Sequence, residues 1–144
     1  MRPMIALPAG AAALAVLLAF ASPTYAETVK FKADLKGSSE VPPNQSAGTG
    51  SVTATYDTAT KLFSWKGSYS GLSGLATAAH FHGPAPAGQN SGVAVAIKPA
   101  TSPFEGSATL TDAQANDLMA GNWYVNVHTD ANKGGEVRGQ LGKM

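Results

Sequence analysis

The three histidines of this sequence have the residue type and the spacing that could bind a metal ion or act in catalysis. His80 and His82 occur two positions apart in the segment AHFHG, and His128 occurs far along the chain in the segment WYVNVHT. On a β-strand, residues i and i+2 project from the same face, about 6.5–7 Å apart at Cα. We therefore expect the two imidazoles to share one face of a strand, with Phe81 on the core side.

His128 lies in an alternating segment whose apolar residues occupy positions 123, 125 and 127. It therefore shares the opposite, polar face with Tyr124 and Asn126. If this strand is a neighbour of the strand with His80 and His82, the three imidazoles can hold one metal ion. Neutral imidazole suits zinc and copper. We expect a single copper or zinc ion as the cofactor, copper before zinc, and no organic cofactor.

The hairpin that follows His128 supplies the auxiliary residues of this expected site. A register that pairs Val127 with Val137 places these residues opposite one another: His128 and Glu136, Asn126 and Arg138, and Tyr124 and Gln140. A carboxylate beside a ligand imidazole orients the ring and raises its basicity. We therefore expect Glu136 to contact His128 or to act as an extra oxygen ligand. Ordinary cross-strand pairs, worth ~0.2–1 kcal/mol each, are the alternative interpretation.

Two other roles for the histidines remain open. The imidazoles could hydrogen-bond to backbone and loops and so stabilise the turn GPAP that follows His82. Direct catalysis without a metal would need a nucleophile beside a base, and the motif Gly-x-Ser-x-Gly does not occur. An enzymatic activity is therefore not the expectation.

The elements that must position these residues are predicted by hydrophobic periodicity. Alternation with period two predicts about eight strands, at 29–36, 52–56, 63–66, 78–82, 93–97, 107–110, 123–128 and 136–141. The segment TDAQ at 111–114 fits a capping box, and Gly121 suits a helix end, which together predict a short helix near 112–120. This order predicts an all-β fold, an antiparallel Greek-key-like β-sandwich. The residues expected to be largely buried are Phe31, Val52, Phe63, Trp65, Phe81, Val95, Val125 and Val127.

Composition excludes several classes of function. The chain has 144 residues, which favours one domain, and 13% of them are charged, about half the usual share. A formal charge of +1 without any run of Lys or Arg argues against nucleic acid as a partner. The absence of cysteine excludes a disulfide framework, a thiol nucleophile and a cysteine zinc site.

The first 26 residues resemble a secretory signal peptide in their organisation. Arg2 provides a positive start, an apolar run extends from 6 to 20, and Ala26 suits the last position before cleavage. An uncleaved anchor is the weaker alternative, because the run is shorter than the ~20 apolar residues a membrane span needs. We expect cleavage after Ala26, one domain over 27–144, no stable membrane anchor after cleavage, and a periplasmic or secreted protein.

Four segments in order carry a resemblance to a known family. They are LKGSSEVPP at 35–43, AHFHGPA at 79–85, WYVNVHT at 123–129 and GEVRGQL at 135–141. Together they resemble the CHRD domain, named after chordin and also found in bacterial exported proteins, over essentially residues 29–142. The resemblance implies an immunoglobulin-like β-sandwich and no particular activity. The animal role in binding growth factors belongs to multi-domain proteins with cysteine-rich modules, and this chain has no cysteine.

The histidine pattern is also similar to that of copper–zinc superoxide dismutase, another Greek-key sandwich. A full two-metal dismutase site is excluded, because it needs more histidines than the three of this chain. Two classes of function therefore remain. One is an exported protein that binds a single metal ion, and the other is a noncatalytic module that binds another exported protein and uses its histidines structurally.

Overall fold

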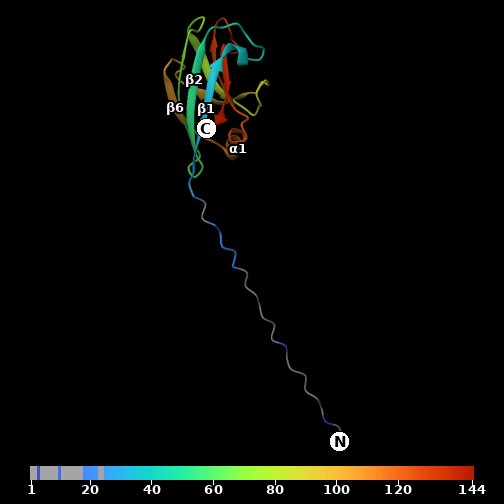
Figure 1. Ribbon diagram of the computed structural model, residues 1–144. Helices are drawn as coiled ribbons and strands as arrows, with labels where there is room; N and C mark the ends of the chain where they lie inside the picture. The colour runs from blue at the N-terminus through green and yellow to red at the C-terminus, as the bar shows by residue number, and fades with distance from the viewer. Residues whose placement is uncertain (1–2, 4–9, 11–17, 23–24) are drawn as a thin grey trace.

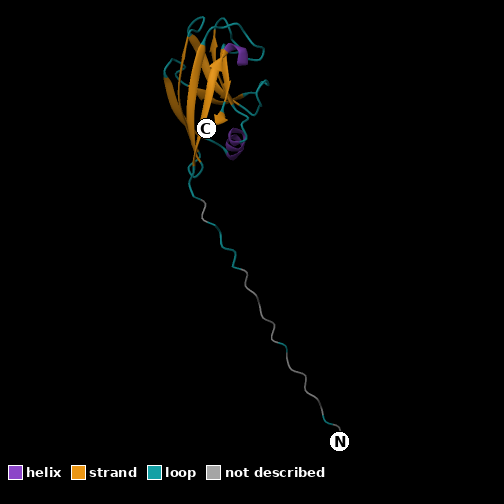
Figure 2. Ribbon diagram, viewed as in Figure 1, coloured by secondary structure: helices purple, strands orange, loops and turns teal. Residues whose placement is uncertain are grey.

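The computed structural model describes residues 3, 10, 18–22 and 25–144. Most of the predicted signal peptide lies outside these residues, so its cleavage stays a prediction. Strands dominate the described part of the chain (Figure 2). The elements are β1 (Thr28–Lys36), the 3-10 turn η1 (Gly37–Ser39), β2 (Thr49–Asp57), β3 (Leu62–Ser70), β4 (Ala76–His82), β5 (Val93–Ile97), β6 (Phe104–Thr109), α1 (Asp112–Met119), β7 (Tyr124–Thr129), β8 (Val137–Gln140) and β9 (Gly142–Lys143).

The strands form a single antiparallel sheet that folds over on itself (Figure 1). Its order is β5-β4-β7-β8-β1-β2-β3-β6, and β9 pairs with β1. The neighbours β4 and β7, and β8 and β1, are not consecutive in sequence, as a Greek-key-like connection requires. The prediction of an all-β antiparallel fold with one short helix is confirmed. Within the described residues, no helix is long and apolar enough to cross a membrane.

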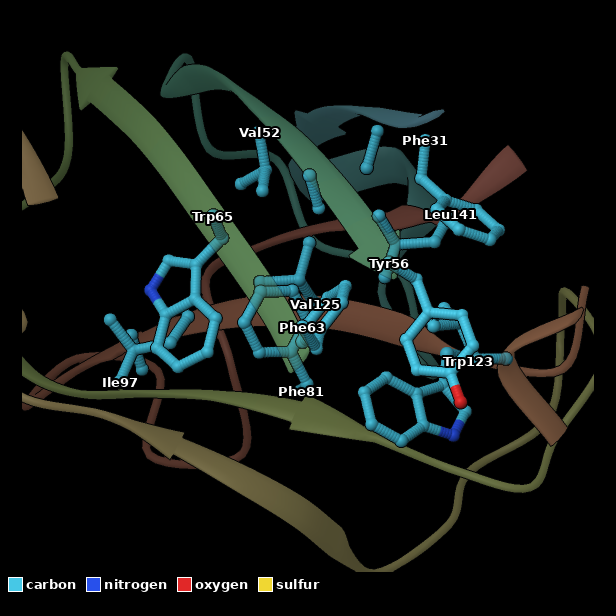
Figure 3. Packing of buried hydrophobic residues seen from close by; sticks show 14 of the residues in the cluster. Phe31, Val52, Tyr56, Phe63, Trp65, Phe81, Ile97, Trp123, Val125 and Leu141 are labelled. Carbon is cyan, nitrogen blue, oxygen red and sulfur yellow. The ribbon is translucent and has the colours of Figure 1, made fainter. Parts of the chain in front are cut away.

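Aromatic side chains fill the space between the two halves of the sheet (Figure 3). Phe63 of β3 packs edge-on against Phe81 of β4 and against Trp123, with ring centroids 5.0 and 5.4 Å apart. Trp65 contacts Phe81 in the same manner at 5.1 Å. Such edge-to-face contacts stabilise a core beyond the burial of apolar area. The residues buried as predicted are Phe31, Val52, Phe63, Trp65, Phe81, Val125 and Val127.

The prediction for Val95 is wrong. Val95 is only half-buried and Val93 of the same strand is 55% exposed, although Ile97 is buried. β5 lies at the edge of the sheet, with β4 as its paired neighbour, and the β4–β5 register shifts between Phe81 and His82. Such an irregularity twists an edge strand away from the core, so the alternation that the sequence shows does not become complete burial.

The helix α1 begins and ends close to its predicted limits. Thr111 Oγ1 accepts a hydrogen bond from Gln114 N at 3.2 Å, and Gln114 Oε1 accepts one from Thr111 N at 3.0 Å. These reciprocal bonds confirm the capping box. Leu118 anchors the helix in the core. Gln114 Nε2 also donates to the Ala94 carbonyl at 3.2 Å, so the helix covers part of the exposed edge of β5.

Candidate metal centre

The strands β4 and β7 are direct neighbours, and this pairing brings the three histidines to one outer face of the sheet. The residues paired across the two strands are Ala78 with His128, His80 with Asn126, and His82 with Tyr124. Phe81 and Val127 project to the opposite side and are fully buried. The histidines therefore lie on the face away from the core, as period-two alternation predicts.

The imidazoles of His80 and His128 are in direct contact. His80 Nδ1 and His128 Nε2 lie 3.1 Å apart, and His128 Nδ1 donates to the Lys133 carbonyl at 2.7 Å. That bond leaves the lone pair of His128 on Nε2, directed toward His80. Two nitrogens bound at about 2.0–2.1 Å to a tetrahedral zinc ion lie about 3.3–3.4 Å apart. The pair is therefore close to the geometry that a metal ion requires.

The third imidazole lies near this pair but has other partners. One ring nitrogen from each of the three histidines lies within 4.8 Å of the other two. His82 Nδ1, however, lies 3.0 Å from the Ser91 carbonyl, and His82 Nε2 lies 2.9 Å from Asn126 Oδ1. Because Nδ1 is directed to the β4–β5 loop, Nε2 is the nitrogen on the side of β7 and of the cluster. Nε2 is therefore engaged with Asn126 in this arrangement.

Tyr124 holds the ring of His82 by stacking, and Arg138 packs on Tyr124. The Tyr124 ring stacks on His82 with centroids 4.7 Å apart and planes inclined by 5°. The guanidinium carbon of Arg138 lies over the Tyr124 ring, 3.5 Å from its centroid. Arg138 also donates to Asn90 Oδ1 at 2.8 Å and to the Gln89 carbonyl. These residues orient His82 through packing, a role that differs from that of a metal ligand.

The environment of His80 and of His82 favours the neutral form of each ring. Burial lowers the pKa of His80, and the nearby charges of His128, His82 and Lys98 lower it further. Burial also lowers the pKa of His82, against the opposing effect of its contacts with Ser91 and Asn126. Metals bind the neutral imidazole, so these shifts favour metal binding at neutral pH.

We expected Glu136 to contact His128, but its carboxylate binds other residues. The pairs Val127–Val137 and Asn126–Arg138 form as predicted, but Glu136 N also donates to the Val127 carbonyl at 2.7 Å. Two consecutive residues thus share one partner, a bulge-like arrangement that turns the carboxylate away from the imidazoles. Its hydrogen bonds come instead from Ser46 Oγ, Ser73 N and Oγ, Thr129 Oγ1 and Asn132 Nδ2. Glu136 is fully buried and connects three loops.

Glu40 is a buried acid close to the site, and it was not among the site residues expected from the sequence. It is 5% exposed and lies beside Asn126 and the backbone of Gly135. Burial raises its pKa to about 7, against the lowering effects of the Arg138 charge and the Asn126 amide. The signal in the sequence is its position in the segment EVPP, whose prolines cannot pair as a regular strand.

Two hollows differ in their relation to the cluster. A small one, about 120 Å³, adjoins His80 and is bordered by Ala78, Ala96 and Lys98. A larger open groove, about 580 Å³, lies over β1, β2, β3 and β6, and no histidine lines it. The three histidines therefore lie away from the larger groove, on the outer face of the β4–β7 half of the sheet.

The fold and the cluster define an antiparallel β-sandwich with three histidines gathered on one outer sheet face. The chain belongs to the CHRD domain family, whose model matches residues 31–141. This range includes all three histidines and Glu40. No curated protein and no solved structure matches the chain.

Proposed function

We propose that this protein is an exported CHRD domain that binds one metal ion through His80, His82 and His128. The observation that carries the proposal is the 3.1 Å separation of His80 Nδ1 and His128 Nε2, with the hydrogen of His128 committed to Lys133 on its other side. An imidazole pair held in this way offers two lone-pair positions to one ion once the hydrogen between the rings is released.

The donor set favours copper over zinc. At a site made of nitrogen ligands, divalent copper binds more tightly than divalent zinc. Three imidazoles also leave a coordination position for water or another small ligand. The proposed role is binding or handling of the ion, since among the described residues no nucleophile is placed beside a base at this cluster.

The family supports the proposed location outside the cytoplasm. CHRD domains are typically extracellular modules, and this chain matches the family over residues 31–141. The apolar run before Ala26 is the feature from which we infer export. Periplasmic and secreted locations are both compatible with this inference.

A second candidate function has its own supporting observation. His82 contacts Ser91 and Asn126 through its two ring nitrogens, and His128 donates to Lys133. Histidines used in this way can be structural, which suits a noncatalytic module that binds another exported protein.

Titration calorimetry of metal-free protein with Cu(II), Cu(I) and Zn(II) separates the two functions. The wild-type chain is compared with a variant in which all three histidines are alanine, and with Glu105→Ala as a control that removes an exposed carboxylate on β6. Binding of one equivalent by the wild type and the control, and its loss in the triple variant, supports the metal site. Equal weak binding by all three proteins overturns it and leaves the interaction module.

A further inference from the structure

His82, the third histidine of the cluster, makes a hydrogen bond that would compete with metal binding. The inference that follows rests on the proposed function. Both His82 nitrogens face oxygen atoms: Ser91 O at 3.0 Å and Asn126 Oδ1 at 2.9 Å. A neutral imidazole carries one N–H, so it can satisfy only one of two acceptors. The orientation of the Asn126 amide therefore decides whether His82 Nε2 carries a hydrogen or a free lone pair.

The Asn126 amide is fixed from the side away from His82. Asn126 is 3% exposed, and its Nδ2 donates to the Gly134 carbonyl at a long 3.3 Å. A Cβ atom on Gly135 would lie 2.5 Å from Asn126 Nδ2 and 2.4 Å from Glu40 Oε1. The amide nitrogen and the carboxylate oxygen therefore meet over the same glycine, where any side chain would separate them.

Glu40 has an unused acceptor at this point. Its Oε1 is buried and has no hydrogen-bond partner among the described residues. The nearest buried cation, Arg138, directs its hydrogen bonds to Asn90 and Gln89. A buried acceptor without a partner is costly, so Glu40 favours the orientation of Asn126 in which Nδ2 faces the carboxylate. In that orientation Oδ1 faces His82.

We propose that Glu40 and Asn126 are positioning residues that hold His82 away from the metal: Glu40 orients the Asn126 amide, and Asn126 Oδ1 retains the hydrogen on His82 Nε2. The resting site then offers the pair of His80 Nδ1 and His128 Nε2, which already lie 3.1 Å apart and share one hydrogen. It gains His82 only when Nε2 loses its hydrogen and leaves Asn126. Because only part of the population has Nε2 free, the apparent affinity for metal is lower than that of the open site.

Nitrogen-15 NMR of the metal-free protein at pH 8 tests this directly, because two-bond ¹H–¹⁵N correlations identify which ring nitrogen carries the hydrogen. For the wild type we expect a population of His82 with the hydrogen on Nε2. Asn126→Ala should move it entirely to Nδ1, where the Ser91 carbonyl accepts it. Glu40→Leu should have the same effect, whereas Glu40→Gln, which keeps an amide oxygen for Asn126 Nδ2, should retain the wild-type pattern. Glu105→Leu serves as the control for loss of an acid elsewhere.

Zinc titration of the same variants gives a second measurement. Asn126→Ala should bind zinc about tenfold more tightly than the wild type, because the competing hydrogen bond is gone. A His82 spectrum that is identical in wild type and Asn126→Ala, or weaker zinc binding by that variant, overturns the proposal. If Glu40→Leu does not fold, Asn126→Ala alone decides. If wild-type protein binds no metal, the proposed function fails, while the NMR spectra still decide whether Glu40 and Asn126 orient His82.

Discussion

His80 and His128 show how much of the site is decided by single atoms. The Lys133 carbonyl accepts the Nδ1 hydrogen of His128, and this one bond directs the lone pair of Nε2 toward His80. His82, only two residues from His80, has a different local environment because Asn126 and Tyr124 surround it. The three histidines therefore differ in which ring nitrogen is free to bind a metal ion.

His128→Ala should remove most of the metal affinity and leave the fold intact. The imidazole supplies one of the two preformed nitrogens, and its side chain lies on the outer face of the sheet. Titration calorimetry measures the affinity, and the far-ultraviolet circular dichroism spectrum checks the fold. Retention of wild-type affinity by a folded His128→Ala protein would show that this residue is not a ligand.

Glu136→Gln should lower stability and leave metal affinity unchanged. The carboxylate is fully buried and accepts hydrogen bonds from residues of three loops and from Thr129 at the end of β7. Hydrogen bonds to a charged group are worth about 1.5–3 kcal/mol each, so we expect a loss of at least about 2 kcal/mol in the free energy of unfolding. Urea unfolding measures it, with Glu105→Gln as the exposed control. A loss of metal affinity at unchanged stability would instead support the carboxylate–histidine contact.

At the scale of elements, the β7–β8 hairpin explains both a successful and a failed prediction. Pairing of Val127 with Val137 follows from two buried valines on the core face, and it fixes Asn126 opposite Arg138. The next pair is lost, since Glu136 N also binds the Val127 carbonyl. A bulge depends on how the connecting loop packs, which the alternation of side chains does not encode.

The N-terminal cap of α1 gives a test at this scale. Thr111→Ala removes the hydroxyl that accepts from Gln114 N, and we expect a cost of ~1 kcal/mol in the free energy of unfolding. Because Gln114 also covers the edge of β5 through Ala94, hydrogen exchange of β5 amides should increase as well. Thr111→Ser, which keeps the hydroxyl, is the matched control. Unchanged stability of Thr111→Ala would mean that tertiary packing alone holds the helix.

At the scale of the whole molecule, two buried acids make the free energy of unfolding depend on pH, and their effects have opposite signs. Burial opposes ionisation of Glu136, but hydrogen bonds from Ser73, Thr129 and Ser46 hold its pKa at about 2. Its ionised form is stabilised by folding, so this contribution is complete above the unfolded pKa of about 4.5 and is lost as the pH falls toward 2. Burial raises the pKa of Glu40 to about 7, so its protonated form is the one that folding favours.

The free energy of unfolding should therefore rise from pH 2 to about 4.5 through Glu136 and decline from about 4.5 to 7 through Glu40. Glu40→Gln should abolish the decline and make the protein more stable than the wild type at pH 8. Urea unfolding of both proteins from pH 3 to 8 measures these changes. A decline of equal size in Glu40→Gln would assign it to another group.

The sequence by itself determined which face of its strand each histidine occupies, the register of the terminal hairpin near Val127, and the limits of the helix. These features depend on local periodicity, on one pair of buried residues and on caps within four residues, all of which can be read along the chain. Membership in the CHRD family rests on the same kind of information, motifs in a given order.

Only the tertiary structure decided that β4 and β7 are neighbours, and therefore that His128 reaches His80. It also decided that Glu136 turns into the loops and that Glu40 is buried beside Asn126. The physical reason is that these contacts join residues distant in sequence. These contacts form only when the sheet and its loops are packed together. The hydrogen bonds made there compensate for burying polar groups that the sequence alone would place in solvent.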